Sequence, residues 1–177
     1  MADIWEIDQS HSSAAFSIRH LMISTVRGTF EGISGRLVGD IDHLDQASVE
    51  LAIDVSTVDT RQKDRDNHLR SGDFFDVATH PTMTFKSRRI EAVGGDRYKV
   101  TGDLTIRGTT REVAVDASYG GQSKDPWGGT RAGFTGTITL NRSDYGLVWN
   151  QALETGGVLV GDAVNISVDL ELVKQAA

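Results

Sequence analysis

The stretch VNISVDLEL, residues 164–172, decides the fold class, because its apolar and polar side chains alternate at every position. Successive side chains of a β-strand point to opposite faces, so this period of two predicts a strand with one dry face and one wet face. Runs with the same period recur along the chain, at residues 5–8, 13–19, 26–41, 49–55, 83–86, 98–107, 112–119 and 134–140. The pattern predicts an all-β protein.

Turn signals separate these runs, among them Gly94-Gly95-Asp96, Gly108 and Gly120-Gly121. About eight long strands that are apolar on one face must bury those faces together, as an antiparallel barrel or a strongly twisted sandwich does. We favour the barrel, because strands of roughly nine residues would leave long unpaired edges in an open sheet. The expected fold is an eight-stranded antiparallel β-barrel that residues 1–177 form as a single domain.

Glycines interrupt the apolar faces of several expected strands, and they allow two interpretations. An eight-stranded barrel is wide enough either to be filled by side chains or to hold one small ligand. Missing side chains favour a cavity, whereas glycines that only let strands bend leave the barrel filled. With strands about 30 Å long, a cavity would suit a long, thin, apolar molecule. The glycines concerned are Gly28, Gly35, Gly39, Gly102 and Gly136.

The stretch TRQKDRDNHLRSGDFFDVATHPTMTF, residues 60–85, lacks the strand pattern and begins with many charged side chains. It predicts a short helical lid around residues 60–71, with Asp59 as N-cap, Gln62 three residues later, and Gly72 as the left-handed residue after the last turn. This helix has one large hydrophobic side chain, so the following phenylalanines must anchor it.

Composition excludes several classes of function. The chain has 18 Lys and Arg against 25 Asp and Glu, a net charge of −7, so it offers no broad basic surface for nucleic acid or for an anionic membrane. It contains no Cys, which excludes disulfides and thiolate metal sites. No apolar run reaches about 18 residues, so we expect no integral membrane segment. Acidic residues occupy the N-terminus where a signal peptide needs basic and apolar ones, which predicts a cytoplasmic protein.

Catalytic and metal-binding motifs are weak. None of the five histidines has the spacing of a metal motif such as H-E-x-x-H. Asp64 and His68 are four residues apart on the expected helix, a spacing that could orient an imidazole but that exposed helix pairs often have. Ser10-His11-Ser12 lacks the G-x-S-x-G context of a nucleophile. We therefore expect neither catalytic residues, nor a metal, nor a cofactor.

Short motifs recur in a specific order along the chain, and together they make it resemble the YceI-like family of polyisoprenoid-binding proteins over essentially its whole length. The resemblance implies a lipocalin-like barrel with a long apolar tunnel for an isoprenoid lipid, such as a polyprenyl chain with a quinone or phosphate head, often in a homodimer. The motifs are Trp5-x-x-Asp8, His11-Ser12, Phe16-x-x-x-His20, Val26-x-Gly28-x-Phe30 with Gly35, Asp59-Thr60, Arg65-Asp66-x-His68-Leu69, Phe74-Phe75, Pro81-x-x-x-Phe85, Gly102-x-Leu104-x-Ile106-x-Gly108, Gly133-Phe134, Arg142 with Gly146, and Gly161-Asp162.

The resemblance, together with the strand pattern, gives a set of expected ligand-binding residues. Eight apolar ones should line the tunnel, and His20, Arg65 and His68 should lie near the head group. Alternatively, Arg65 pairs with a neighbouring carboxylate and His68 caps a strand end, so that both hold the lid shut without touching ligand. The full set is Phe16, Ile18, His20, Phe30, Arg65, His68, Phe74, Phe75, Phe85, Leu104 and Phe134.

The expected function is noncatalytic binding, storage or transport of an isoprenoid lipid, because burial of an apolar tail drives binding without any reactive group. One alternative is an enzyme that acts on an isoprenoid or its phosphate, using His68 or His20 with Asp66. Another is a filled barrel whose connection from Asn141 to Asp162 binds a protein partner.

Overall fold

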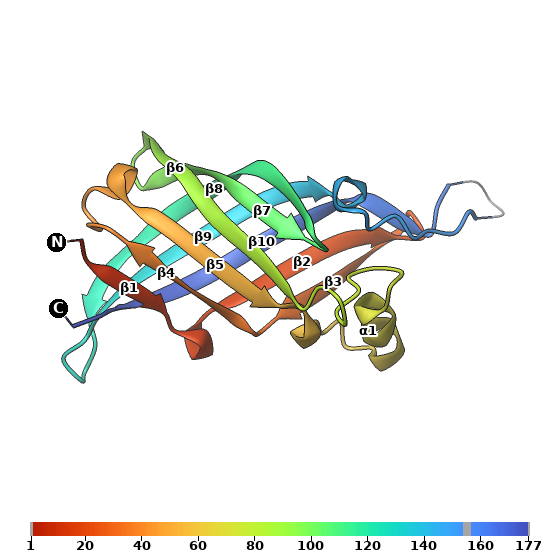
Figure 1. The fold of residues 1–177 in the computed structure, drawn as a ribbon, viewed down its shortest axis with the longest axis horizontal. Coiled ribbons are helices and arrows are strands. Elements are labelled where there is room, and N and C mark those ends of the chain that lie inside the picture. The colour runs from red at the N-terminus through yellow and green to blue at the C-terminus, as the bar shows by residue number, and fades with distance from the viewer. Residues whose placement is uncertain (1, 154–156, 177) are drawn as a thin grey trace.

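Strands make up most of the chain and form one antiparallel sheet that curls into a barrel (Figure 1). The computed structural model describes residues 2–153 and 157–176. The connection from Asn141 to Asp162 therefore includes three residues, 154–156, that lie outside the described part. The elements are β1 (Ile4–Ile7), β2 (Ser13–His20), β3 (Ser24–Phe30), β4 (Ile33–Val38), β5 (Ser48–Asp54), α1 (Lys63–Arg70), β6 (Thr82–Gly94), β7 (Arg97–Ile106), β8 (Thr109–Lys124), β9 (Thr130–Asn141) and β10 (Val160–Lys174), with four short 3-10 turns.

Eight strand positions close the barrel, as the sequence predicts. The sheet runs β1-β4-β5-β6-β7-β8-β9-β10, and β1 also pairs with β10, which completes the ring. The remaining two strands share positions with others. Strand β2 pairs with the part of β10 that β1 does not reach, and β3 pairs with β2. Thus β1 with β2, and β3 with β4, act as two interrupted strands of an eight-stranded antiparallel barrel.

The barrel wall is not a continuous sheet beside β3. This strand pairs with β2 on one edge, and on the other the described residues form one isolated bridge, between Thr29 and Asp59. The space between β3 and β6 is taken by the chain that joins β5 to β6, residues 55–81, which we call the lid segment. It contains α1, at the same end of the barrel as the tip of the β2–β3 hairpin (Figure 1). The lid segment therefore replaces part of the barrel wall.

Helix α1 begins three residues later than predicted. Its N-cap is Gln62, whose side-chain oxygen accepts the Arg65 N–H (2.6 Å), whereas the Asp59 carboxylate accepts the Arg61 N–H (2.8 Å). Asp59 cannot cap the helix, because its backbone bridges to Thr29 and Arg61 then turns left-handed (φ 66°). Among the described residues, no helix is long and apolar enough to cross a membrane.

The predicted C-terminal signal of α1 is also wrong. The helix ends at Arg70, its C-cap Ser71 is extended, and Gly72 does not adopt a left-handed conformation. The Ser71 hydroxyl donates to the carbonyl of His68 (2.6 Å), so a side chain satisfies one of the last free carbonyls of the helix.

The glycines play two parts, and only one of them, the bending of strands, is among the interpretations that the sequence allows. A side chain at Gly28 would collide with the ring of Phe16, and one at Gly102 with the ring of Phe85. Aromatic rings of neighbouring strands thus fill the space that these two glycines leave. Gly35 and Gly39 have positive φ (145° and 144°), so they serve the bending of β4 and its end.

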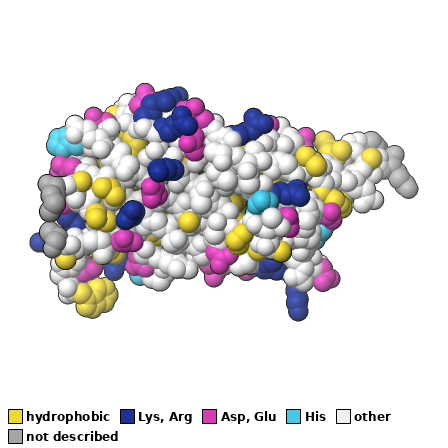
Figure 2. Space-filling view, in the orientation of Figure 1, with side chains coloured by type: hydrophobic (Ala, Val, Ile, Leu, Met, Phe, Trp, Pro, Cys, Tyr) yellow, Lys and Arg dark blue, Asp and Glu magenta, His cyan; other side chains and the backbone are white. Residues whose placement is uncertain are grey.

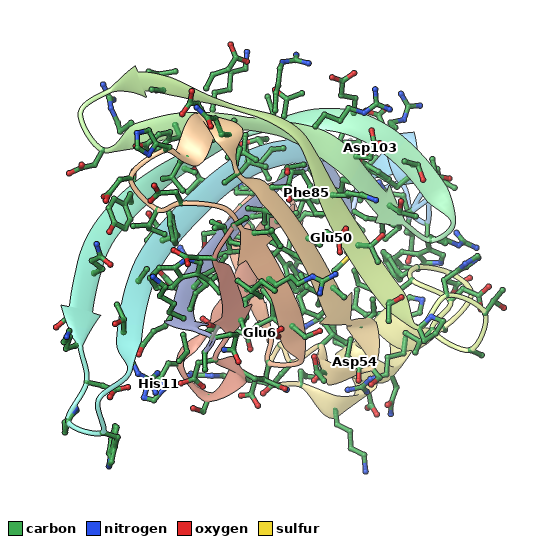
Figure 3. The ribbon with its side chains drawn as sticks, turned by 60° about the vertical axis from the view of Figure 1, so that its left-hand side comes forward. Glu6, His11, Glu50, Asp54, Phe85 and Asp103 are labelled. Carbon is green, nitrogen blue, oxygen red and sulfur yellow. The ribbon has the colours of Figure 1, made fainter. Side chains whose placement is uncertain are left out.

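Outward and inward side chains separate cleanly. Glu50 pairs with Lys86 and Asp103 with Arg88, both on the outside of the barrel, whereas the neighbouring Phe85 points inward (Figure 3). At the end of the barrel that holds both chain termini, a compact group of buried side chains fills the interior. This group, the Trp5 cluster, consists of Trp5, Leu37, Ile41, Leu44, Ile90, Ala132 and Leu172.

An arginine links β9 and β10 to the turn after β1. The guanidinium of Arg131 donates to carboxylates of Asp8 (2.7 Å), Asp125 (3.0 Å) and Glu171 (2.9 Å). Arg131, with Ser10 and His11, holds the pKa of Asp8 well below its usual range. Charge-assisted hydrogen bonds to a shared cation connect three segments that are distant in sequence, around Asp8, from Asp125 to Arg131, and around Glu171.

Substitution of Gly35 by Ala should destabilise the barrel by at least about 2 kcal/mol, because the residue has positive φ and its Cβ would lie 2.0 Å from the Glu50 carbonyl oxygen. Gly133→Ala is the matched control on β9, since a Cβ there meets nothing within 4 Å. Urea denaturation of both variants measures the difference, and equal free energies of unfolding would contradict the strand geometry.

The Arg131 cluster predicts a pH-dependent stability. Because the pKa of Asp8 is lower in the folded than in the unfolded chain, its contribution is present above about pH 4 and is lost as the pH falls towards the folded value. The difference in free energy of unfolding between wild type and Asp8→Asn should therefore be largest near neutral pH and shrink below about pH 4. Asp116→Asn, at an exposed position of β8, is the control. A difference that stays constant down to about pH 2 would contradict the prediction.

Candidate functional site

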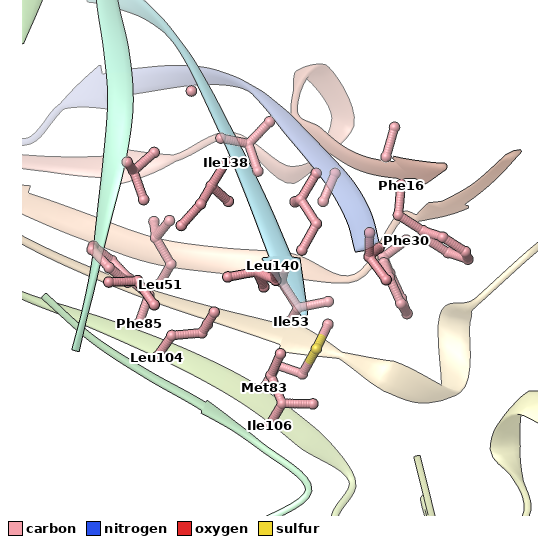
Figure 4. A pocket seen from close by; sticks show the side chains of 18 of the residues that line it. Phe16, Phe30, Leu51, Ile53, Met83, Phe85, Leu104, Ile106, Ile138 and Leu140 are labelled. Atoms are coloured by element: carbon pink, nitrogen blue, oxygen red, sulfur yellow. The ribbon is translucent and has the colours of Figure 1, made fainter. Parts of the chain in front are cut away.

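The barrel encloses a cavity of about 390 Å³ whose wall is almost entirely apolar (Figure 4). This volume lies within the range of small-molecule sites. Strands β2 to β10 all contribute inward-facing side chains, and the lid segment and the loop after β9 complete the wall at one end. The period of two therefore identified the cavity wall correctly, strand by strand. Labelled examples are Phe16, Phe30, Leu51, Ile53, Met83, Phe85, Leu104, Ile106, Ile138 and Leu140.

All eleven residues that the sequence analysis selected lie on this wall. They come from strands far apart in the chain and from the lid segment, and the fold brings them around one space. Their contact with a ligand stays a prediction. They are Phe16, Ile18, His20, Phe30, Arg65, His68, Phe74, Phe75, Phe85, Leu104 and Phe134.

The few charged or titratable wall residues, apart from two tyrosines, are all basic. They are found at the lid end of the cavity, and among the described residues no carboxylate lines the wall. This bias is notable in a chain that has seven more Asp and Glu than Lys and Arg residues. Such a wall favours a ligand whose polar end carries negative charge or accepts hydrogen bonds. The basic wall residues are Arg19, His20, Arg65, His68 and Arg142.

Arg65 holds the start of the lid segment together. Its guanidinium donates to the Thr60 hydroxyl (2.7 Å) and to the Thr60 carbonyl (2.6 Å). The buried carboxylate of Asp66 accepts hydrogen bonds from the Thr60 N–H (2.8 Å) and from the Thr60 hydroxyl. Arg65 therefore acts on the lid through a threonine rather than through the neighbouring carboxylate that the alternative interpretation named.

His68 belongs to an aromatic cluster that joins the lid segment to the loop after β9. Its Nε2 donates to the carboxylate of Asp73 (2.8 Å), and its ring meets Phe74 and Trp149 edge-on, with centroids 5.0 and 4.7 Å away. Asp64, which the sequence suggested as its partner, is not the residue it contacts. With its nitrogen on Asp73, His68 positions the lid and presents a ring edge to the cavity.

Arg142 pins the loop after β9, a role that the sequence analysis missed although the residue stood in a family motif. It is 5% exposed, and its guanidinium donates to the carbonyls of Leu147 (2.7 Å), Trp149 (2.8 Å) and Gly161 (2.8 Å). Burial lowers the pKa of Arg142, and the charge of Asp162 opposes this effect. The three carbonyls satisfy the buried cation and fix the loop beside the cavity.

Tyr145 is a second wall residue that the sequence did not reveal. It is 2% exposed, and its hydroxyl has no hydrogen-bond partner among the described residues. Burial raises the pKa of this hydroxyl. An unpaired buried hydroxyl is costly, so an oxygen of a bound molecule would be a favourable partner for it. A tyrosine in a short turn carries no periodic signal, so the strand pattern could not identify it as a wall residue.

The polar cluster at the N-terminal end does not form a catalytic site. The Ser10 hydroxyl and the Asp8 carboxylate both contact the same nitrogen of His11, Nδ1, at 3.1 and 2.8 Å, whereas in a catalytic triad the serine bonds to Nε2 and the carboxylate to Nδ1. Asp8, His11 and Glu171 have the spacing of metal ligands, but Arg131 donates to both carboxylates and supplies the positive charge there.

Comparison with known proteins finds a family model and sequence relatives that match most of the chain. A family model described as the YceI-like domain matches residues 5–172. The UPF0312 protein SERP2314 of Staphylococcus epidermidis is 43% identical over 168 residues, which cover 94% of this chain and 95% of that protein.

Solved structures share the architecture. BcnA of Burkholderia cenocepacia superposes with a TM-score of 0.82 at 27% identity, covering 93% of this chain and 98% of that chain. A polyisoprenoid binding domain from Saccharophagus degradans has a TM-score of 0.74 at 17% identity, covering 97% and 98%. The second similarity shows a common fold.

Tyr145→Phe should separate ligand binding from stability. Removing an unpaired buried hydroxyl should leave the free energy of unfolding of lipid-free protein unchanged or raise it by up to about 1 kcal/mol, while the affinity for a polyprenyl phosphate falls roughly fivefold. Thermal unfolding and fluorescence titration measure the two effects.

Tyr98→Phe is the matched control, because Tyr98 also lines the cavity but is only half-buried. Marked destabilisation of lipid-free Tyr145→Phe, with unchanged affinity, would show that the hydroxyl serves the fold and not a ligand.

Proposed function

This chain belongs to the YceI-like domain family, and we propose that it binds a long isoprenoid lipid in the barrel cavity without catalysing a reaction on it. The observation that carries the proposal is the apolar cavity of about 390 Å³ inside a closed barrel. The Saccharophagus degradans domain, which shares the fold, is a polyisoprenoid binding domain and supports the same ligand class. Storage or transport of that lipid is the expected role.

The shape of the cavity supports a thin, extended ligand. Its wall reaches from Trp149 at the lid end to Leu44 and Ile90, which belong to the Trp5 cluster at the other end. Burial of each methylene contributes about 0.8 kcal/mol, so a tail of a few isoprene units supplies enough free energy for tight binding. No reactive group is needed for this.

The distribution of charge supports one orientation of the ligand. The tail would point towards the Trp5 cluster, and a quinone or phosphate head would lie at the lid end, near the basic wall residues and the free hydroxyl of Tyr145. The enzyme alternative is less favoured, because His68 and Asp66 are occupied by contacts that hold the lid segment. The homodimer and the cytoplasmic location stay predictions.

Extraction with organic solvent of protein purified without detergent, followed by mass spectrometry, tests the proposal. We expect a long apolar molecule at a ratio near one per chain. Ile138→Trp should sharply reduce this occupancy, because the larger side chain fills the middle of the cavity, whereas Thr137→Trp adds the same bulk on the exposed face of β9 and should leave it unchanged.

Circular dichroism must show both variants folded. A clean extract from folded wild type that also fails to take up added polyprenyl phosphate or ubiquinone would refute the proposed function.

A further inference from the structure

The hairpin between β2 and β3 ends in three apolar residues in an unfavourable turn. The Ile23 N–H donates to the His20 carbonyl (3.2 Å), and the two central residues, Leu21 and Met22, are left-handed (φ 54° and 63°). Hairpin turns with two left-handed central residues favour Asn-Gly, because most side chains are strained there. Bulky apolar residues at strained turn positions point to a function outside the stability of the fold.

These apolar side chains are exposed and continue onto a neighbouring loop. Met22 is 59% exposed, Ile23 79%, and Val158 37%. The tip contacts that loop, since the Leu21 N–H donates to the carbonyl of Leu159 (2.8 Å). Hydrophobic side chains gather at this end of the molecule in Figure 2. We call Leu21, Met22, Ile23 and Val158 the apolar rim.

The apolar rim borders the cavity. On β2, His20 directly precedes the rim and lines the cavity; on the loop, Leu159 directly follows Val158 and lines it as well. The opposite end of the barrel is filled by the Trp5 cluster. A molecule that leaves the cavity at this end therefore passes the rim.

The charge of the β2–β3 hairpin, which carries three of the four rim residues, is opposite in sign to that of the whole chain. Residues 12–30 contain Arg19 and Arg27 but no Asp or Glu, although the chain has 25 acidic residues. Both arginines are exposed, and Arg19 donates to the carbonyl of Met22 (3.2 Å), directly behind the tip. On the other rim segment, the exposed carboxylate of Asp162 lies 3.8 Å from the guanidinium of Arg142. Because salt screens charges beyond roughly 10 Å, the acidic remainder of the chain weakens this local field little.

We propose that the apolar rim docks onto an anionic lipid bilayer, with Met22 and Ile23 inserted among the lipids and Arg19 and Arg27 facing the head groups. Exposed apolar residues beside basic ones form the usual combination for binding at a membrane surface. Docking would bring the cavity to the bilayer that supplies or receives the isoprenoid lipid. This last role rests on the proposed function, whereas the docking itself does not.

A second copy of the chain fits the rim less well. In a two-fold symmetric dimer the same patch faces itself, which would bring Arg19 and Arg27 against their own equivalents. A stable dimer also buries about 800 Å² on each partner, more than the tip of one hairpin provides. A small projecting tip suits a deformable lipid surface better.

Vesicle sedimentation tests the docking with phosphatidylcholine vesicles that contain about 30% phosphatidylglycerol, compared with pure phosphatidylcholine. Leu21→Asn/Met22→Gly gives the turn its preferred residues and removes two apolar side chains. The double variant should lose at least tenfold in vesicle partitioning while its melting temperature stays equal or rises. Arg27→Gln should lower partitioning onto the anionic vesicles only.

Trp127→Ser is the control, because Trp127 is 83% exposed on the β8–β9 turn at the opposite end of the barrel. It should partition like wild type. The proposal would be overturned if the double variant partitioned onto vesicles like wild type. It would also be overturned if analytical ultracentrifugation showed wild type as a dimer and the double variant as a monomer, because the rim would then be a dimer interface.

Solvent extraction of the same samples keeps the two proposals distinct. Lipid retained by a double variant that no longer binds vesicles supports both. A wild type that binds vesicles but neither contains nor takes up lipid refutes the proposed function and leaves the docking intact.

Discussion

Strand β10 hydrogen-bonds to β9 on one edge and to β2 and then β1 on the other, which leaves no long free edge on its fifteen residues. The cavity depends on this closure, because a ring of eight strands has a fixed circumference and its inward side chains must share the space inside. Rings such as those of Phe16 and Phe85 lie against glycines of neighbouring strands, and this close approach keeps the aromatic bulk near the wall. The centre of the barrel stays open as a result.

The hydrogen-bond ladder of the barrel is interrupted at one place, the free edge of β3, and the lid segment lies there. Its apolar side chains pack against the barrel core, but its side-chain hydrogen bonds are mostly internal or with adjoining loops. Arg70 donates to the carbonyls of Ser56 and Val58, and Arg107 joins Gly72 to Gly146 of the loop after β9. These are side-chain hydrogen bonds at the protein surface, so opening the lid would break few of the ladder bonds that hold the barrel.

Sequence periodicity predicted the barrel and its wall, because alternation with a period of two identifies the buried face of each strand. Residues in turns carry no such signal, so Tyr145 and the part played by Arg142 emerged only from the structure. The misplaced start of α1 has a related cause. Asp59 and Gln62 form a plausible capping pair locally, but the bridge of Asp59 to Thr29, thirty residues earlier, holds it in an extended conformation.

The role of the glycines was similarly invisible, because the ring that fills the space at Gly28 comes from β2, and the ring at Gly102 comes from β6. The register between strands decides whether the space beside a glycine stays empty or is filled by a side chain of the neighbouring strand. Both alternatives remained open on sequence grounds, and the structure assigns a different outcome to different glycines.

Net charge alone does not indicate where basic groups gather on this barrel. Glu50 and Asp103 face solvent on the outer barrel wall, whereas the charged groups that the described residues place on the cavity wall are basic and lie at the lid end. An acidic exterior keeps the protein soluble and repels anionic surfaces from most directions. The basic lid end, with the apolar rim, is the face on which attraction to an anionic surface would exceed this repulsion. The charge pattern would therefore turn this face of the barrel towards such a surface before any apolar contact forms.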